Sequence, residues 1–295
     1  MGRPVIIFDT TALNRFAEDR KGLDPLISGL KVGYRVRLTA TNVDEVVATR
    51  DAAERDHLLD VCRDLLKSES TEIIRPFHEL IGESILEFDK RISFDWRCVP
   101  LRLPEYEREV ALQKLLDNEL STAQREHAAQ ARAEFEAVFC DARPHFEEIF
   151  RAGTESRPSS VAELVSRLQV DGGAFWSFGM GLYERPAKRR PDEETMRRFV
   201  ESCPPFQALL LALCVAQYDR SIREIQELEL LAGRDDLFMS VYLPYCDEFV
   251  SDDRGQRRCL REVASLAKLP VRVCWFREFR DSFSVNLFSR VTGRN

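Results

Sequence analysis

Segments with the character of buried strands occur only near the two ends of this chain. They are short, and they are either apolar throughout or alternate in polarity. Five are recognisable: Val5–Phe8, Tyr34–Thr39, Glu72–Arg75, Glu248–Ser251 and Val271–Phe276. Helix-like stretches separate the strands within each end, as in a parallel sheet built from βα units. The pattern predicts one parallel sheet, to which residues 1–75 and 206–295 both contribute, with the first strand in its centre.

The middle of the chain, residues 76–205, reads almost entirely as helix, and prolines mark its breaks. We expect it to pack beside the sheet as a large helical insertion that adds no strand. Further helices are expected at Thr11–Glu18, at Asp24–Leu30 with a proline in its first turn, from a cap at Thr41 or Asn42 to Leu66, and at Phe206–Asp219, Ile222–Ala232, Leu237–Tyr245 and Gly255–Ala267. The fold class is therefore α/β, and residues 1–295 are expected to form a single domain.

Composition excludes several classes of protein. The longest apolar run, Phe206–Val215, is too short to cross a bilayer, and charged residues break up the N-terminus, so we expect a cytoplasmic protein without membrane contact. Eight cysteines without a CxxC pair favour neither a zinc site nor a disulfide framework. The formal net charge of −7 argues against a general nucleic-acid coat. It is compatible with a nuclease, because carboxylates that bind cations add to the negative count.

Four acidic positions lie at the ends of predicted strands or at the starts of predicted helices. Asp9 follows the first strand, and Glu45 lies in the first turn of the helix after the second strand. Asp236 lies where the helix Leu237–Tyr245 begins, and Asp253 follows the fourth strand. The carboxyl ends of parallel strands meet at one edge of a sheet, where ligands bind in open α/β folds. Mg²⁺ and Mn²⁺ prefer such oxygen ligands. Two such ions can ionise a water and stabilise the leaving oxygen of a phosphodiester.

Asp9 and Glu45 differ in how readily a structural role explains them. Glu45 can be the third-position partner of a capping box begun by Asn42. Asp9 follows a wholly apolar strand, and Thr10 and Thr11 already offer hydroxyls for capping the next helix.

The other two acidic positions are doublets. Asp235 or Asp236 can cap a helix, and Asp252 or Asp253 can cap the helix from Gly255. Either aspartate of each doublet can therefore supply the metal ligand. Thr10, Asn14 and Ser251 are the polar neighbours expected to orient the carboxylates or a water.

Three segments that carry these carboxylates resemble a PIN-like domain: IIFDTTALNRF, TNVDEVVATRDAAERDHLLDV and DLFMSVYLPYCDEFVSDD. PIN domains are three-layer α/β folds with a central parallel sheet, and many are Mg²⁺- or Mn²⁺-dependent ribonucleases. Asp9, Glu45, Asp236 and Asp253 match the four acidic positions of that family's motif. The step from Ser251 to Asp253 is similar to the family's Thr-x-Asp, with serine in place of threonine.

The resemblance implies a metal-dependent endoribonuclease in which a metal-bound water attacks the phosphodiester; RNA is favoured over DNA by the resemblance alone. It covers the two ends, about half of the chain, and residues 76–205 match nothing comparable. An insertion of this size can cover the cleft, bind a specific RNA or hold a protein partner or inhibitor. The alternative is an inactive PIN-like module that binds RNA or a protein through the insertion. A haloacid-dehalogenase-type phosphatase would need an aspartate at the position of Thr11.

Four arginines near the acidic positions fall at helical spacing: Arg254, Arg257, Arg258 and Arg261. They form either a phosphate-contacting stripe on the helix that follows Asp253 or a solvated basic face that balances nearby acids.

Overall fold

The computed structural model describes residues 3–18, 20–49, 51–67, 71–91, 93–107, 109–110, 130, 157–170, 173–223, 225, 227 and 230–283. Much of the middle of the predicted insertion, residues 111–129 and 131–156, lies outside the described residues. The following statements concern the described residues.

The centre of the molecule is a five-stranded sheet in the order β3-β2-β1-β4-β5, and every pairing is parallel. The strands are β1 (Val5–Phe8), β2 (Arg35–Thr39), β3 (Thr71–Ile74), β4 (Glu248–Val250) and β5 (Arg272–Cys274). In register, Ile7 of β1 faces Arg37 of β2 on one side and Phe249 of β4 on the other. Both ends of the chain therefore build one sheet around β1, and the predicted α/β class with a central parallel sheet is confirmed.

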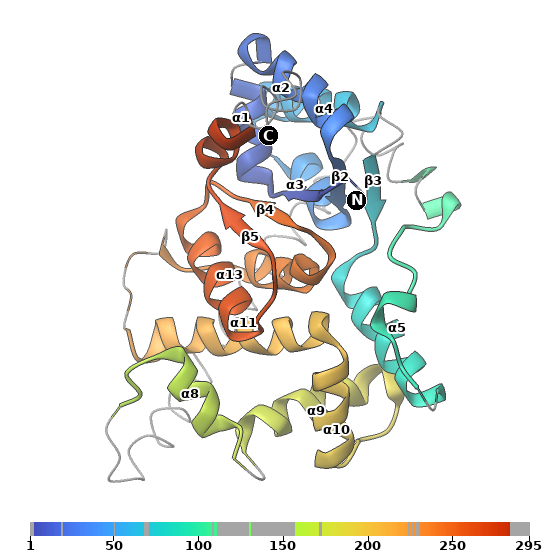
Figure 1. The fold of residues 1–295 in the computed structure, drawn as a ribbon, viewed down its shortest axis with the longest axis vertical. Coiled ribbons are helices and arrows are strands. Elements are labelled where there is room, and N and C mark those ends of the chain that lie inside the picture. Colours follow the sequence, from blue (N-terminus) through green and yellow to red (C-terminus); the bar gives the residue numbers. More distant parts are fainter. Residues whose placement is uncertain are drawn as a thin grey trace, which may run out of the picture.

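Alternating residues of the strands serve two separate cores, which makes three layers. Ile6 and Phe8 point into one core, whereas Ile7 points into the other. The first core is closed by α1 (Thr10–Glu18), α2 (Arg20–Gly33), α3 (Ala40–Ala48) and α4 (Ala52–Leu66). Figure 1 shows this layer at the top of the molecule. Phe276 and Phe279, which follow β5, complete it.

The second core joins the opposite face of the sheet to the insertion and to the segment that follows it. Its helices are α5 (Phe77–Lys90), α8 (Val161–Leu168), α9 (Ala174–Ala187), α10 (Glu193–Ser202), α11 (Pro204–Ser221), α12 (Arg234–Phe238), the 3₁₀ helix η3 (Met239–Tyr245) and α13 (Arg254–Leu266). α11 lies between the sheet and the outer helices of the insertion (Figure 1). Ile74 and Phe249 of the sheet share this core with Phe199 of α10.

The described part of the insertion adds no strand to the sheet. It contributes one isolated antiparallel bridge, between Ile74 and Arg102, beyond the short 3₁₀ helix η1 (Trp96–Cys98). Among the described helices none is by itself long and apolar enough to cross a membrane; α10 and α11 pass that test only as a pair that bends by 105°.

Several helix boundaries differ from the predicted ones. The long helix expected from Thr41 or Asn42 is two helices: Thr39 caps α3, and the chain is extended at Thr49 before Asp51 caps α4. The helix predicted at Asp24–Leu30 begins earlier, at Arg20, so that its proline lies in the interior.

Two helices predicted between α11 and β4 also differ from the structure. The described residues between Ile222 and Ala232 form no α-helix. The predicted helix Leu237–Tyr245 is instead the end of α12 followed by a 3₁₀ helix that contains Pro244.

Candidate functional site

Asp9 is buried at the carboxyl end of the central strand. Its backbone N–H donates to Val250 (3.0 Å), and its carboxylate accepts hydrogen bonds from the N–H of Ala12 (2.8 Å) and the hydroxyls of Thr11 and Ser251 (2.9 Å each). Asp9 therefore does cap the next helix, and the threonine hydroxyl that was expected to do so supports the aspartate instead. Burial raises the pKa of Asp9 to about 7 in spite of these hydrogen bonds, and the charge of Asp236 adds to the effect.

Glu45 faces the same edge of the sheet from α3. The hydroxyl of Thr10 donates to its carboxylate. The capping box of α3 is made by Thr39 and Asn42, so the structural explanation considered for Glu45 does not hold. Burial raises the pKa of Glu45 to about 8, and the neighbouring charges that raise it further are those of Asp236, Asp235 and Asp9. Three separate elements thus bring like charges together.

Asp236 is the member of its doublet that is held in place. It is the third residue of α12; its carboxylate accepts from the backbone N–H of Gly233 (2.7 Å) and from the side-chain amide of Gln256 (2.9 Å). The side chain of Asp235 is 41% exposed and lies 3.7 Å from Arg234. Asp236 thus satisfies the N–H of Gly233, the N-cap of α12, and is also the leading charged neighbour of Asp9.

The two aspartates of the second doublet have different partners. The carboxylate of Asp252 forms an ion pair with Arg15 (2.6 Å) and accepts from the N–H of Phe276 (2.9 Å). Asp253 is the N-cap of α13 through the N–H of Gln256 (2.6 Å). The capping role proposed for one member of this doublet is therefore correct for Asp253, while Asp252 fastens the loop to α1.

The polar residues expected around the carboxylates have separate tasks. Thr10 connects Glu45 to the side-chain amide of Asn42 (3.4 Å), and Ser251 links Asp9 to the N–H of Asp253 (3.1 Å). The side-chain oxygen of Asn14, one turn after Thr10, is buried and has no hydrogen-bond partner in the described structure.

Two supporting residues were missed in the sequence. Thr11 bonds both to Asp9 and to the N–H of Asp252 (2.9 Å), and the buried Gln256 holds Asp236. The signal for Gln256 was present, since Asp253 and Gln256 have the spacing of a capping box.

In the described structure no lysine or arginine pairs with Asp9 or Glu45, in contrast to the buried carboxylates of Glu72 and Asp219. Two arginines bind each of the latter: Arg37 and Arg102 bind Glu72, and Arg223 and Arg258 bind Asp219. No ion pair joins Asp9 or Glu45 to a lysine or arginine within the described part of the chain. A site that gathers carboxylates without their counter-ions favours an added cation.

The donor set fits an open site for a hard cation. No group of three or more His, Cys, Asp or Glu side chains in the described structure forms a ready metal-binding cluster. Mg²⁺ is, however, commonly held by one or two carboxylates, with waters and substrate phosphates in the remaining positions. Asp9, which is buried, and Glu45 and Asp236, which are half-buried, match that chemistry through their carboxylate oxygens.

The four arginines of α13 do not form one uniform stripe. Arg258 binds the carboxylate of Asp219 (2.6 Å), and Arg261 donates to the carbonyl of Val273 (2.8 Å). Arg257 lies over the ring of Trp275. Arg254 is exposed.

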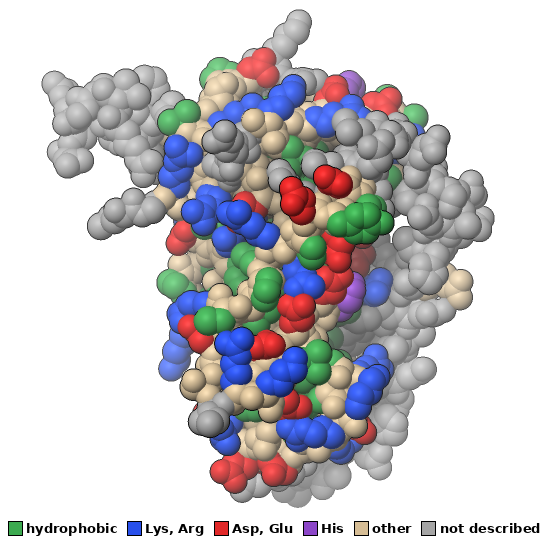
Figure 2. All heavy atoms as spheres, turned by 90° about the vertical axis from the view of Figure 1, so that its right-hand side faces the viewer, with side chains coloured by type: hydrophobic (Ala, Val, Ile, Leu, Met, Phe, Trp, Pro, Cys, Tyr) green, Lys and Arg blue, Asp and Glu red, His purple; other side chains and the backbone are tan. Residues whose placement is uncertain are grey.

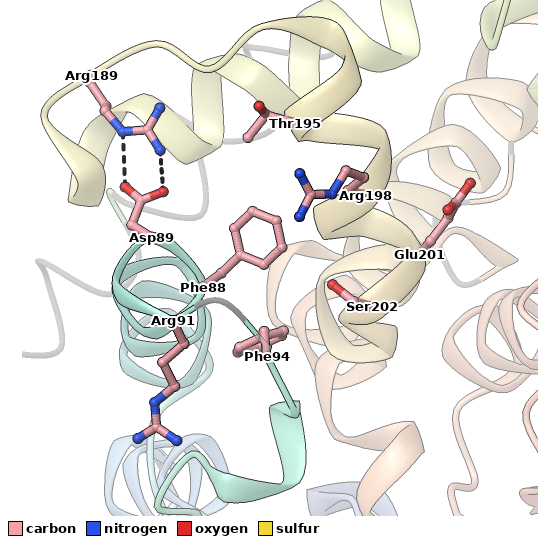
Figure 3. A pocket seen from close by; sticks show the side chains of 9 residues that line it. All are labelled: Phe88, Asp89, Arg91, Phe94, Arg189, Thr195, Arg198, Glu201 and Ser202. Atoms are coloured by element: carbon pink, nitrogen blue, oxygen red, sulfur yellow. Dashed lines mark hydrogen bonds and ion pairs between the residues drawn. The ribbon is translucent and has the colours of Figure 1, made fainter.

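A pocket that contains arginines lies in the insertion, between α5 and α10 (Figure 3). Asp89 holds Arg189 there through two hydrogen bonds, one of 3.1 Å from Nε, while Arg198 lies 6.0 Å from the ring centre of Phe88. Acidic and basic groups both line this pocket. On the face of the molecule beside β3 and α5, basic and acidic side chains are likewise intermixed (Figure 2).

Comparison of the chain with models of protein families, with curated proteins and with solved structures finds no match.

Proposed function

We propose that this protein is a divalent-cation-dependent phosphodiesterase of the PIN-like type that cleaves RNA. The single observation that carries the proposal is the meeting of Asp9, Glu45 and Asp236 at the carboxyl edge of the central strands. Burial raises the pKa values of Asp9 and Glu45, the charge of Asp236 raises both further, and no ion pair to either is found in the described structure. RNA rather than DNA is chosen on the sequence resemblance alone.

In this proposal the three carboxylates would hold Mg²⁺ or Mn²⁺. The bound ion supplies an activated water and neutralises charge on the phosphate. The chain itself supplies position: Thr11 and Ser251 fix Asp9, and Thr10 fixes Glu45. No side chain needs to act as nucleophile.

The test is Asp9→Asn, which keeps the capping hydrogen bond but removes the charge. We expect the variant to lose Mn²⁺-dependent cleavage of a mixed RNA pool. Mn²⁺ should also raise the melting temperature of the wild type but not that of the variant, because a cation stabilises only the state that binds it.

The matched control is Asp252→Asn, on the same edge of the sheet but paired with Arg15. It should retain cleavage and the response to Mn²⁺. Retained cleavage in Asp9→Asn would refute the assignment of the centre.

One specific feature favours a second function, that of a non-catalytic module that binds RNA or a protein through the helical insertion. The described residues hold no group of three or more His, Cys, Asp or Glu side chains that could bind a metal ion. Such a module would show no Mn²⁺-induced rise in melting temperature and no cleavage by the wild type on any RNA.

A further inference from the structure

An arginine-rich cleft runs along α13. It measures about 790 Å³. Its lining residues are Arg223, Leu230, Arg254, Arg257, Arg258, Arg261, Glu262 and Trp275. Five arginines against one glutamate make this the most basic of the described pockets, on a protein whose formal net charge is −7.

Internal partners account for some of these arginines. The carboxylate of Asp219, which is 1% exposed, binds both Arg223 (2.9 Å) and Arg258 (2.6 Å). Glu262 adds a second ion pair to Arg223 (3.0 Å). Arg261 pairs with the half-exposed Glu278 (3.2 Å). These side chains build the wall of the cleft, and their charge is largely balanced.

Arg254 and Arg257 are different, because no ion pair joins either one to a carboxylate within the described structure. The guanidinium of Arg257 lies 3.3 Å from the ring centre of Trp275, and its buried Nε has no hydrogen-bond partner there. Burial lowers the pKa of Arg257, and the positive charges of Arg261 and Arg254 lower it further. The aromatic ring thus holds a planar cation in a fixed orientation, with its donors available to an anion.

The helix α13 connects the cleft to the carboxylate centre, because the side-chain amide of Gln256 on that helix donates to Asp236 (2.9 Å). Asp253 caps α13, Arg254 is the first residue of that helix, and Arg257 lies one turn further on. One helical turn advances by about 5 Å. Arg254 and Arg257 therefore flank Gln256, the residue that holds Asp236, while none of the three carboxylates lines the cleft.

We propose that this cleft binds backbone phosphates of a nucleic-acid strand adjacent to the bond that is cut, with Arg254 and Arg257 as the phosphate-contacting residues. That this nucleic-acid strand is the substrate rests on the proposed function. Arginine suits phosphate because its fork of N–H donors matches the phosphate oxygens. Arg258 and Arg261, in contrast, act as positioning residues of the wall.

The test measures the binding of a short fluorescent single-stranded RNA by anisotropy, in EDTA so that cleavage does not interfere, over a range of salt concentrations. The variant is Arg254→Ala with Arg257→Gln. The control, Arg91→Ala with Arg97→Ala, removes the same charge, and Arg97 also lies over a tryptophan (5.1 Å from the ring centre of Trp96).

We expect the cleft variant to bind about tenfold more weakly and its salt slope to fall by about 0.7 for each lost contact. The control should keep both values. An unchanged slope in the cleft variant, or an equal fall in the control, overturns the proposal. Arg254→Ala alone, at an exposed position, provides the same test if the double variant melts early.

An acidic peptide is the competing occupant. If polyglutamate binds the wild type through Arg254 and Arg257 and RNA does not, the nucleic-acid assignment is wrong. Failure of the proposed function looks different: RNA binding would still depend on the two arginines, while Mn²⁺ would produce no cleavage.

Discussion

At the scale of single residues, the buried carboxylates of this protein have two kinds of partner. Burial by itself would raise the pKa of Glu72, but the hydrogen bonds and charges of Arg37 and Arg102 lower it. Asp9 instead receives hydroxyl and backbone donors, and its pKa stays raised at about 7. A carboxylate stabilised in this second way costs the fold free energy whenever it is ionised without a cation nearby.

This cost predicts a pH dependence. Because the pKa of Asp9 is higher in the folded state (about 7) than the ordinary value of 3.8 for an aspartate, the folded state retains the proton longer, and wild-type stability falls as the pH rises between these values. Asp9→Asn cannot ionise. In EDTA its free energy of unfolding should equal that of the wild type below about pH 4 and exceed it by roughly 2–4 kcal/mol above about pH 7.

Urea unfolding of both proteins across this pH range measures the difference. Addition of Mn²⁺ near neutral pH should reduce it by stabilising the wild type. A difference that does not change with pH would show that Asp9 is ionised at no cost in the folded protein.

Whereas Asp9→Asn is expected to raise stability, a substitution of Arg258 is expected to lower it, because its partner Asp219 is only 1% exposed. Arg258→Ala removes one of two cations from Asp219 and should lower the free energy of unfolding by about 1–3 kcal/mol. Arg254→Ala, on the same helix but exposed, should change it by less than about 0.5 kcal/mol. Urea unfolding measures both variants. An equal loss of stability in the two would contradict the assignment of Arg258 to the wall of the cleft and of Arg254 to its exposed surface.

At the scale of elements, the junctions between strands and helices place the site. α3 starts directly after β2 because Thr39 ends the strand and caps the helix at the same time. Its hydroxyl accepts from the N–H of Asn42 (3.0 Å), and its N–H donates to the Asn42 side chain (3.0 Å). This reciprocal pair fixes where the helix begins and therefore where Glu45 lies.

Loss of this cap should be measurable. Thr39→Ala removes a buried hydroxyl and leaves the N–H of Asn42 without its partner, which should cost about 1–2 kcal/mol of stability. Thr39→Ser keeps the hydroxyl and should cost less. The Mn²⁺-induced rise in melting temperature should weaken in Thr39→Ala more than in Thr39→Ser, since Glu45 loses its fixed position. Equal responses in the two variants would show that the cap does not position Glu45.

The strands were predictable from the sequence, whereas several helix ends were not. Each strand is an apolar or alternating run, and burial on both faces of a parallel sheet requires such runs. The segment before α12 contains apolar residues at helical spacing, yet Arg258 and Arg220 bind the carbonyls of Leu230 (2.8 Å) and Ala232 (3.1 Å) from outside. Contacts between residues so far apart in the sequence leave no local sequence pattern from which they could be predicted.

The candidate site shows the same division. The position of Asp9 at a strand end is visible in the sequence, because a parallel sheet gathers its carboxyl ends. The choice within the second doublet depends on Arg15 and on the N–H of Phe276, which come from distant segments. The separation of Arg254 and Arg257 from Arg258 likewise depends on the buried Asp219.

At the scale of the whole molecule, the sheet separates two cores that differ in origin. One is built by the first helices of the chain and the residues after β5, whereas the other joins the sheet to the insertion. Phe199 of α10 occupies the middle of an aromatic cluster in the second core. Its ring neighbours, at 4.9–6.0 Å between centres, are Phe88, Phe94, Tyr183 and Phe206. Because this core also contains Ile7 and Phe249, the insertion and the sheet are expected to unfold together.

Phe199→Ala tests this expectation. The substitution removes a fully buried ring and should lower stability by about 3–5 kcal/mol. If sheet and insertion are one cooperative unit, hydrogen exchange of the slowest amides in β1 and β4 should accelerate by the same free energy as that of the slowest amides in α10. Phe178→Ala is the control, since that ring is 48% exposed on α9 and its loss should have little effect. Faster exchange confined to the insertion would show that residues 76–205 fold as a separate unit and that the single-domain prediction is wrong.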